Sequence, residues 1–133
     1  MRQNYSTGAK WESIVGYSRA VRIGDVIEVS GTVSLKDGAP FGIGDPYLQA
    51  KRTLEIIGDA LNHFGATFEH VIRTRTYVTN VNDWEAVGKA HGEVFGDIRP
   101  ATSLLEVSAL ISPDYLVEIE ATAIAPVHNM NLA

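Results

Sequence analysis

Short runs of apolar, β-branched residues dominate the first part of the chain and have the pattern of strands. Residues 14–21 and 26–33 form two such runs, and Arg22-Ile23-Gly24-Asp25 between them has the composition of a hairpin turn. We therefore predict a pair of strands over 14–21 and 26–33.

The apolar period then changes from that of a strand to that of a helix. Asp45-Pro46 offers an N-cap acceptor followed by proline, where its missing N–H leaves no bond unmade. Apolar residues recur at helical spacing at Leu54, Ile57, Leu61 and Phe64. Gly65 can end the helix in a left-handed conformation. We predict a helix over residues 47–64.

The second half repeats this alternation. Residues 71–78 have the pattern of a strand, with Thr74 and Thr76 expected on the same face as Ile72. Asn82 or Asp83 is expected to cap a second helix, whose apolar stripe holds Trp84, Val87, His91 and Val94. Pro100 blocks further helix, and strands are predicted over 103–110 and 115–125.

The predicted order is ββαβαββ, an α+β fold in one domain spanning residues 1–133. Two amphipathic helices can cover one face of a mixed sheet. In the last strand the positions that alternate with Val117, Ile119 and Ala121 are themselves mixed, so neither face of this strand is purely polar. We expect the uncovered sheet face to bring copies of the chain together.

Composition and charge narrow the possible functions. The formal net charge of −5 argues against general nucleic-acid binding, which needs clustered Lys and Arg. The absence of cysteine excludes disulfides, thiolate catalysis and cysteine-ligated metals. The first residues lack the apolar core of a signal peptide, and no apolar run is long enough to span a membrane. We expect a cytoplasmic protein with no membrane partner.

Two carboxylates are the first candidates for chemistry. Glu118 and Glu120 share one face of their strand, because the side-chain period there is two. Either could hold and activate a water as a general base. Spacing alone favours the alternative that both are surface or interface carboxylates paired with arginines. Glu106 has the same ambiguity.

A glycine after an apolar strand gives a second candidate. Gly31 follows Ser30 and would let a ligand approach the backbone N–H groups. The alternative is a bulge or bend in the strand, which the pattern alone favours. No base is evidently paired with Ser30, so a nucleophilic serine is a weak interpretation.

The histidines give little support for a metal or cofactor site. His91 lies on an apolar helical stripe, a setting more typical of a hydrogen-bonded core or interface residue. His63, His70, His91 and His128 have no metal-ligand spacing. Gly42-Ile43-Gly44 lacks the rest of a phosphate-binding loop. We expect neither metal nor cofactor.

Several motifs in a fixed order resemble the RidA/YjgF family over nearly the whole chain. They are Gly16-Tyr17-Ser18, Val29-Ser30-Gly31, Val81-Asn82-Asp83-Trp84, Pro100-Ala101-Thr102-Ser103 and Val117-Glu118-Ile119-Glu120-Ala121. The resemblance implies a chorismate-mutase-like fold in a homotrimer, with sheets facing inward and small-molecule clefts between subunits.

The resemblance also assigns residues to these clefts. It implies that Tyr17, Ser30, Gly31 and Glu118 line a cleft from one subunit. Gly88 and Thr102 fall where the imine-deaminating members place an asparagine and a carboxylate-binding arginine, and would come from the neighbouring subunit.

Thr102 narrows what the resemblance implies about function. In the deaminating relatives the arginine holds the carboxylate of a 2-imino acid while a glutamate-bound water attacks the C=N carbon. A threonine side chain cannot make the charged, bidentate contact with a carboxylate that an arginine makes. We therefore expect a metabolite other than a plain 2-imino acid, unless Arg99 or Arg19 reaches the cleft.

His91 follows Gly88 by one helical turn and could assist as an acid–base group. The alternatives are a non-catalytic metabolite-binding or sensing trimer and, less favoured by the acidic charge, a ribonuclease or translation inhibitor.

Overall fold

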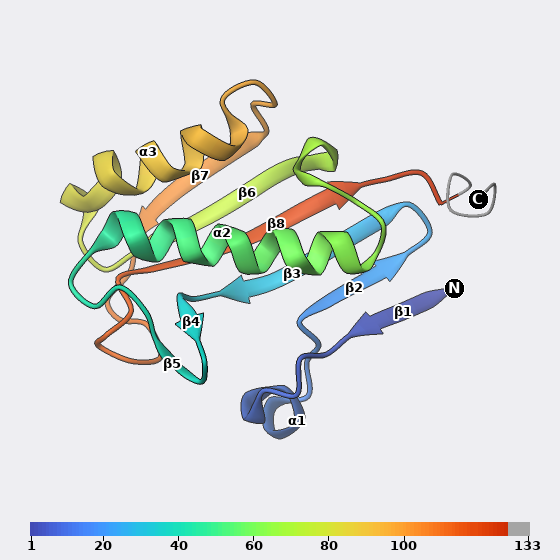
Figure 1. Ribbon diagram of the computed structural model, residues 1–133, viewed down its shortest axis with the longest axis horizontal. Helices are drawn as coiled ribbons and strands as arrows, with labels where there is room; N and C mark the ends of the chain where they lie inside the picture. Colours follow the sequence, from blue (N-terminus) through green and yellow to red (C-terminus); the bar gives the residue numbers. More distant parts are fainter. Residues whose placement is uncertain (128–133) are drawn as a thin grey trace.

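The computed structural model describes residues 1–127, which form a six-stranded sheet with two long helices on one face (Figure 1). The strand order is β1-β2-β3-β8-β6-β7. Only β6 and β7 pair in parallel, so the sheet is mixed. The sheet strands are β1 (Arg2–Tyr5), β2 (Ala20–Ile23), β3 (Val26–Thr32), β6 (Val71–Val78), β7 (Ala101–Glu106) and β8 (Val117–Ile124).

The remaining elements connect or cover these strands. The helices are α1 (Lys10–Val15), α2 (Pro46–His63), α3 (Trp84–Phe95) and the short 3₁₀ helices η1 (Phe68–His70) and η2 (Val81–Asp83). β4 (Leu35–Lys36) and β5 (Ala39–Pro40) form a separate two-stranded hairpin. No helix among residues 1–127 is long and apolar enough to cross a membrane. The mixed sheet with α2 and α3 on one face confirms the predicted fold class.

Helix α2 forms as its sequence predicts. The Asp45 side chain accepts a hydrogen bond from the Leu48 N–H at 3.0 Å, and Pro46 is the first helical residue. The apolar stripe is buried against β3 and β8. Fully buried Gln49 ties the helix to the loop before β8, since its Nε2 donates to the Asp114 carbonyl and its Oε1 accepts from the Leu116 N–H, both at 2.8 Å.

The predicted first strand over 14–21 is wrong. Ile14 and Val15 end helix α1 and are 69% and 68% exposed. Gly16 then takes a left-handed φ of 88°, which closes the helix, and β2 starts only at Ala20. A short apolar run carries no information on whether it is a strand or the exposed end of a helix.

Three smaller expectations also need correction. Ile72 is 49% exposed while Thr74 and Thr76 are buried, because a register shift between Val71 and Arg73 turns Ile72 away from them. Trp84 is 57% exposed and lies off the buried stripe of α3. The N-cap of α3 is Asp83, but its side chain makes no capping bond.

The sheet face opposite α2 and α3 is mixed in character. Glu28, Glu118, Glu120 and Thr122 lie on it by strand alternation, together with several exposed apolar side chains. The apolar members are Ile23, Val26, Leu105 and Ile124, between 43% and 55% exposed. This agrees with the expectation that the face is not purely polar.

Candidate functional site

Glu118 lies directly over Gly31 on the uncovered face of the sheet. The β3–β8 register shifts between Val29 and Thr32, so Ser30 and Gly31 form an irregularity in β3. A Cβ built on Gly31 would lie 2.1 Å from Glu118 Oε2, well inside contact distance. The bend that the sequence pattern favoured is therefore present, and it leaves space for the Glu118 carboxylate.

Arg19 joins this pair from the neighbouring strand end. Its guanidinium donates to the Gly31 carbonyl at 2.6 Å. Its Nε is buried and, within the described part of the chain, has no hydrogen-bond partner. We call Arg19, Gly31 and Glu118 the Glu118 cluster.

The pKa values in the Glu118 cluster reflect burial opposed by charge. Burial raises the pKa of the Glu118 carboxyl, the nearby Arg19 cation lowers it, and the Glu120 carboxylate raises it again. Burial lowers the pKa of Arg19, against the effect of the anionic groups around it. A carboxylate with a raised pKa is a better proton acceptor from water at neutral pH.

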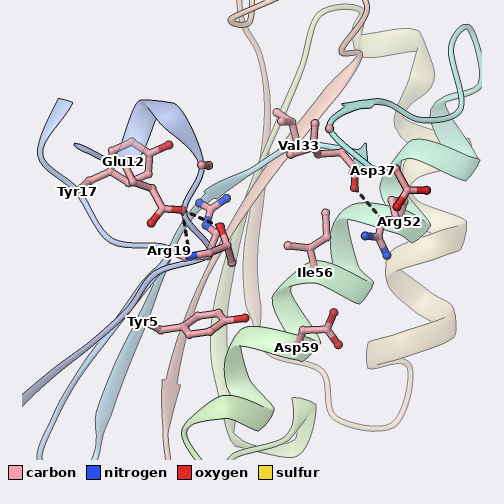
Figure 2. Close-up of a pocket in the computed structure, with 13 residues that line it drawn as sticks. Tyr5, Glu12, Tyr17, Arg19, Val33, Asp37, Arg52, Ile56 and Asp59 are labelled. Atoms are coloured by element: carbon pink, nitrogen blue, oxygen red, sulfur yellow. Dashed lines mark hydrogen bonds between the residues drawn. The ribbon is translucent and has the colours of Figure 1, made fainter. Parts of the chain in front are cut away.

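Ser30 and Tyr17 border the cluster without joining it. The Ser30 hydroxyl donates to the Ser18 carbonyl at 2.6 Å, which is a structural bond. Tyr17 and Arg19 line a pocket of about 250 Å³ between the N-terminal segment, the β4–β5 hairpin and α2. Figure 2 shows Ile56 of α2 across this pocket from Tyr17.

A second polar cluster lies at β6, β7 and α3. His91 Nε2 is 2.8 Å from Thr74 Oγ1, which is 2.8 Å from Thr102 Oγ1. Thr74 is fully buried, His91 is half-buried, and Thr102 is exposed. Burial lowers the pKa of His91. We call these three residues the His91 chain; Thr74 faces the helices and Glu118 lies on the opposite face of the sheet, so the chain does not reach Glu118.

The other candidates have structural partners. Arg99 donates to the Gly96 carbonyl at 3.1 Å, at the end of α3, so of the two arginines considered it is Arg19 that lies at Glu118. Glu106 accepts from the Val81 N–H at 2.9 Å, and Glu120 lies 3.6 Å from the Arg75 guanidinium. Apart from its two chain neighbours and the backbone of its own helix, no described part of the chain lies within 4 Å of a Cβ built on Gly88.

No group of three His, Asp or Glu side chains within residues 1–127 could hold a metal ion. His128 lies outside the described residues.

Sequence reasoning missed Thr74, the residue that links His91 to Thr102. Its signal was present, since a threonine at a core-facing position of an apolar strand needs a hydrogen-bond partner when buried. The helix that would supply this partner could not be aligned with the strand from sequence.

Comparison with known proteins shows the family to which the chain belongs. A family model described as endoribonuclease L-PSP matches residues 7–125. The crystal structure of a YjgF/YER057c/UK114 family member from Mycobacterium tuberculosis is 47% identical, with a TM-score of 0.86 over 94% of this chain and 100% of that chain. This chain belongs to the RidA/YjgF family.

Two further relatives of this RidA/YjgF chain differ in what is known of their function. An uncharacterised protein from Streptomyces coelicolor is 41% identical over 117 residues, covering 88% of this chain and 87% of its own. The 2-iminobutanoate/2-iminopropanoate deaminase of Mus musculus is 30% identical over 128 residues, covering 93% and 92%. Some relatives are therefore imine deaminases, and the fold expectation is confirmed.

Proposed function

We propose that this protein is a cytoplasmic homotrimer that binds a small metabolite in clefts between subunits and hydrolyses or deaminates a C=N-type bond. The observation that carries the proposal is the Glu118 carboxylate, half-buried and seated over Gly31 beside Arg19. The deaminase named among the relatives supports the reaction class. The metabolite is not a plain 2-imino acid, because Thr102 offers no cation to a carboxylate and Arg19, the cation beside Glu118, is already bonded to the Gly31 carbonyl at 2.6 Å.

The reaction needs one proton acceptor and one water. Glu118 takes a proton from the water, whose oxygen forms a bond to the C=N carbon while the π electron pair moves to nitrogen. Protonated Glu118 returns this proton to the nitrogen, and it then moves the proton of the newly added hydroxyl to the nitrogen as well. The C–N bond breaks as the C=O bond forms, and ammonia leaves. The sum is imine plus water giving carbonyl compound plus ammonia. Glu118 is suited to the first step because its pKa is raised by burial.

Ammonia release from a panel of imines and their uncharged analogues tests the reaction. Glu118→Gln keeps the shape of the side chain and removes the proton acceptor, so we expect its rate to fall by about a hundredfold or more. Glu106→Gln is the matched control, since Glu106 serves as an acceptor for the Val81 N–H at 2.9 Å. An unchanged rate in Glu118→Gln would remove Glu118 from the mechanism.

The mixed, uncovered sheet face supports the trimer. Ile23, Val26, Leu105 and Ile124 expose apolar area there beside charged residues, as interfaces between copies do. Light scattering should give a mass three times the 14.4 kDa of one chain. A mass equal to one chain would contradict the assembly.

Thr102 favours a second candidate function, a trimer that binds or senses a metabolite without turnover. Binding of panel compounds with no ammonia release at any pH would support it. The ribonuclease activity in the family's name is opposed by the net charge of −5. RNA cleavage by purified protein that is lost in Glu118→Gln would reverse that judgement.

A further inference from the structure

The His91 chain connects a half-buried imidazole to an exposed hydroxyl through a fully buried one. His91 comes from α3, Thr74 from β6 and Thr102 from β7, the strand at the edge of the sheet. Both links, Nε2 to Thr74 Oγ1 and Thr74 Oγ1 to Thr102 Oγ1, measure 2.8 Å. These are ordinary hydrogen-bond lengths, so the three groups are coupled.

Counting protons shows what this coupling does. Thr74 has one hydroxyl proton and can donate it to only one of its two partners. If Thr74 donates to His91, Thr102 must donate inward and presents lone pairs to the outside. If His91 donates to Thr74, Thr74 donates to Thr102, and the Thr102 proton points outward. In the first arrangement the outward Thr102 hydroxyl can only accept a hydrogen bond; in the second it can donate one and keeps a free lone pair. In neither arrangement does it carry a charge.

The imidazole is held so that it can set this polarity. The His91 ring packs on Phe95, with ring centroids 4.7 Å apart and planes inclined by 42°. Burial lowers its pKa, which favours the neutral ring. Positions beside it are open, because a Cβ built on Gly88 or Gly92 has nothing within 4 Å among the described residues apart from the chain neighbours and the backbone of α3.

We propose that Thr102 recognises an uncharged carboxamide of the ligand, which can donate or accept a hydrogen bond, and that His91, acting through Thr74, is the positioning residue for the Thr102 hydroxyl. The proposal rests on the proposed function for the location of the ligand between subunits. It adds the class of substrate: a C=N compound that carries an uncharged carboxamide where a 2-imino acid carries its carboxylate. An oriented hydroxyl compensates a neutral dipole, but it leaves a buried carboxylate short of charge.

Pyruvamide and pyruvate are a matched pair of probes. They differ only in amide against carboxylate, and as ketones they resemble products of C=N hydrolysis, so their binding needs no turnover. Titration calorimetry with the Glu118→Gln trimer measures the preference directly. We expect pyruvamide to bind more tightly, and we expect Thr102→Val to lose about threefold to tenfold of that affinity while Thr102→Ser retains it. Stronger binding of pyruvate, or binding of neither probe, would overturn the proposal.

The positioning role has a readout of its own. Nitrogen-15 NMR of the His91 ring reports which ring nitrogen carries the proton. We expect one tautomer in the wild type, and a changed ring signal in both Thr74→Val and Thr102→Val. Thr76→Val is the control, since Thr76 is buried on the same face of β6, two residues away and outside the chain of bonds. A His91 signal that is indifferent to Thr102→Val would show that the two residues are not coupled.

The two proposals can fail separately. If the wild-type protein prefers the amide but releases no ammonia, or releases it equally well in Glu118→Gln, only the catalytic function is contradicted. Normal ammonia release with no amide preference contradicts the role of Thr102 alone.

Discussion

The Glu118 cluster and the His91 chain are two polar sites built on one sheet in opposite ways. The Glu118 cluster is made of charges and backbone: a carboxylate over a glycine whose carbonyl is bound by a guanidinium. The His91 chain is made of side chains and of hydroxyls without charge. Charge suits proton transfer, while an oriented neutral dipole suits recognition. The two sites lie apart within one chain. In the proposed trimer, a cleft between subunits would bring the Glu118 cluster of one copy to the His91 chain of another.

The largest effect should come from filling the space under Glu118. Gly31→Ala places a methyl group 2.1 Å from the present position of Glu118 Oε2, so the carboxylate must move. We expect ammonia release to fall by about a hundredfold or more, with the fold retained, because the clash is with the end of a flexible side chain. Gly92→Ala, at an open position of α3, is the control. Equal activity in the two variants would contradict the importance of this contact.

The second effect would turn the neutral site into a charged one. Thr102 is exposed on the edge strand, so Thr102→Arg can be accommodated without rebuilding the core. We expect the preference between pyruvate and pyruvamide to move toward pyruvate by about tenfold to a hundredfold, the effect of one charge-assisted contact. Calorimetry on both probes measures it. An unmoved preference would place Thr102 away from the ligand.

A third effect concerns the pH dependence of the Glu118 cluster. Glu118 must be deprotonated to accept a proton, and its pKa lies above the ordinary value of 4.5, so the acid limb of activity should lie above that value too. Arg19→Gln removes the cation that lowers this pKa and should move the limb to higher pH. Glu120→Gln removes a nearby negative charge and should move it to lower pH. Shifts of the same sign in rate–pH profiles would contradict this electrostatic account.

The smallest effect is expected at Gly88 in α3, which differs from Gly31 in β3 in having open space around it. Gly88 lies within helix α3 with open space around it, so Gly88→Ala should raise the free energy of unfolding by about 0.5–1 kcal/mol through helix propensity. Chemical denaturation measures the change. A loss of stability would show that another copy of the chain packs on this position.

Local patterns predicted much of the fold. Asp45-Pro46 and the apolar period placed a helix over 47–64, close to the observed α2 (Pro46–His63), and β6 spans Val71–Val78 as expected. The prediction of a strand over 14–21 failed because Ile14 and Val15 belong to α1 and Gly16, in a left-handed conformation, closes that helix before β2 begins. A run of apolar residues does not reveal such a helix end.

The candidate site was less predictable than the fold. Glu118 and Gly31 were each singled out from sequence, but their contact depends on the irregular β3–β8 register, which joins residues far apart in the chain. Thr74 was visible only as a strand residue, because the partner that makes it significant comes from a helix packed across the sheet. Long-range register and packing therefore carried the information that local patterns lacked.

Gly31 restricts which substitutions the Glu118 cluster can accept in evolution more than anything restricts Thr102 of the His91 chain. Any other residue there would push the Glu118 carboxylate away, so the proposed proton acceptor keeps its position only while residue 31 is glycine. Thr102 is exposed on the edge strand, so replacing it meets no steric clash of this kind, although its hydrogen bond to Thr74 is lost. If Glu118 and Thr102 act as proposed, a lineage with this architecture can alter which molecule it accepts while the Glu118 carboxylate stays in place, and new specificities would accumulate at the edge of the sheet.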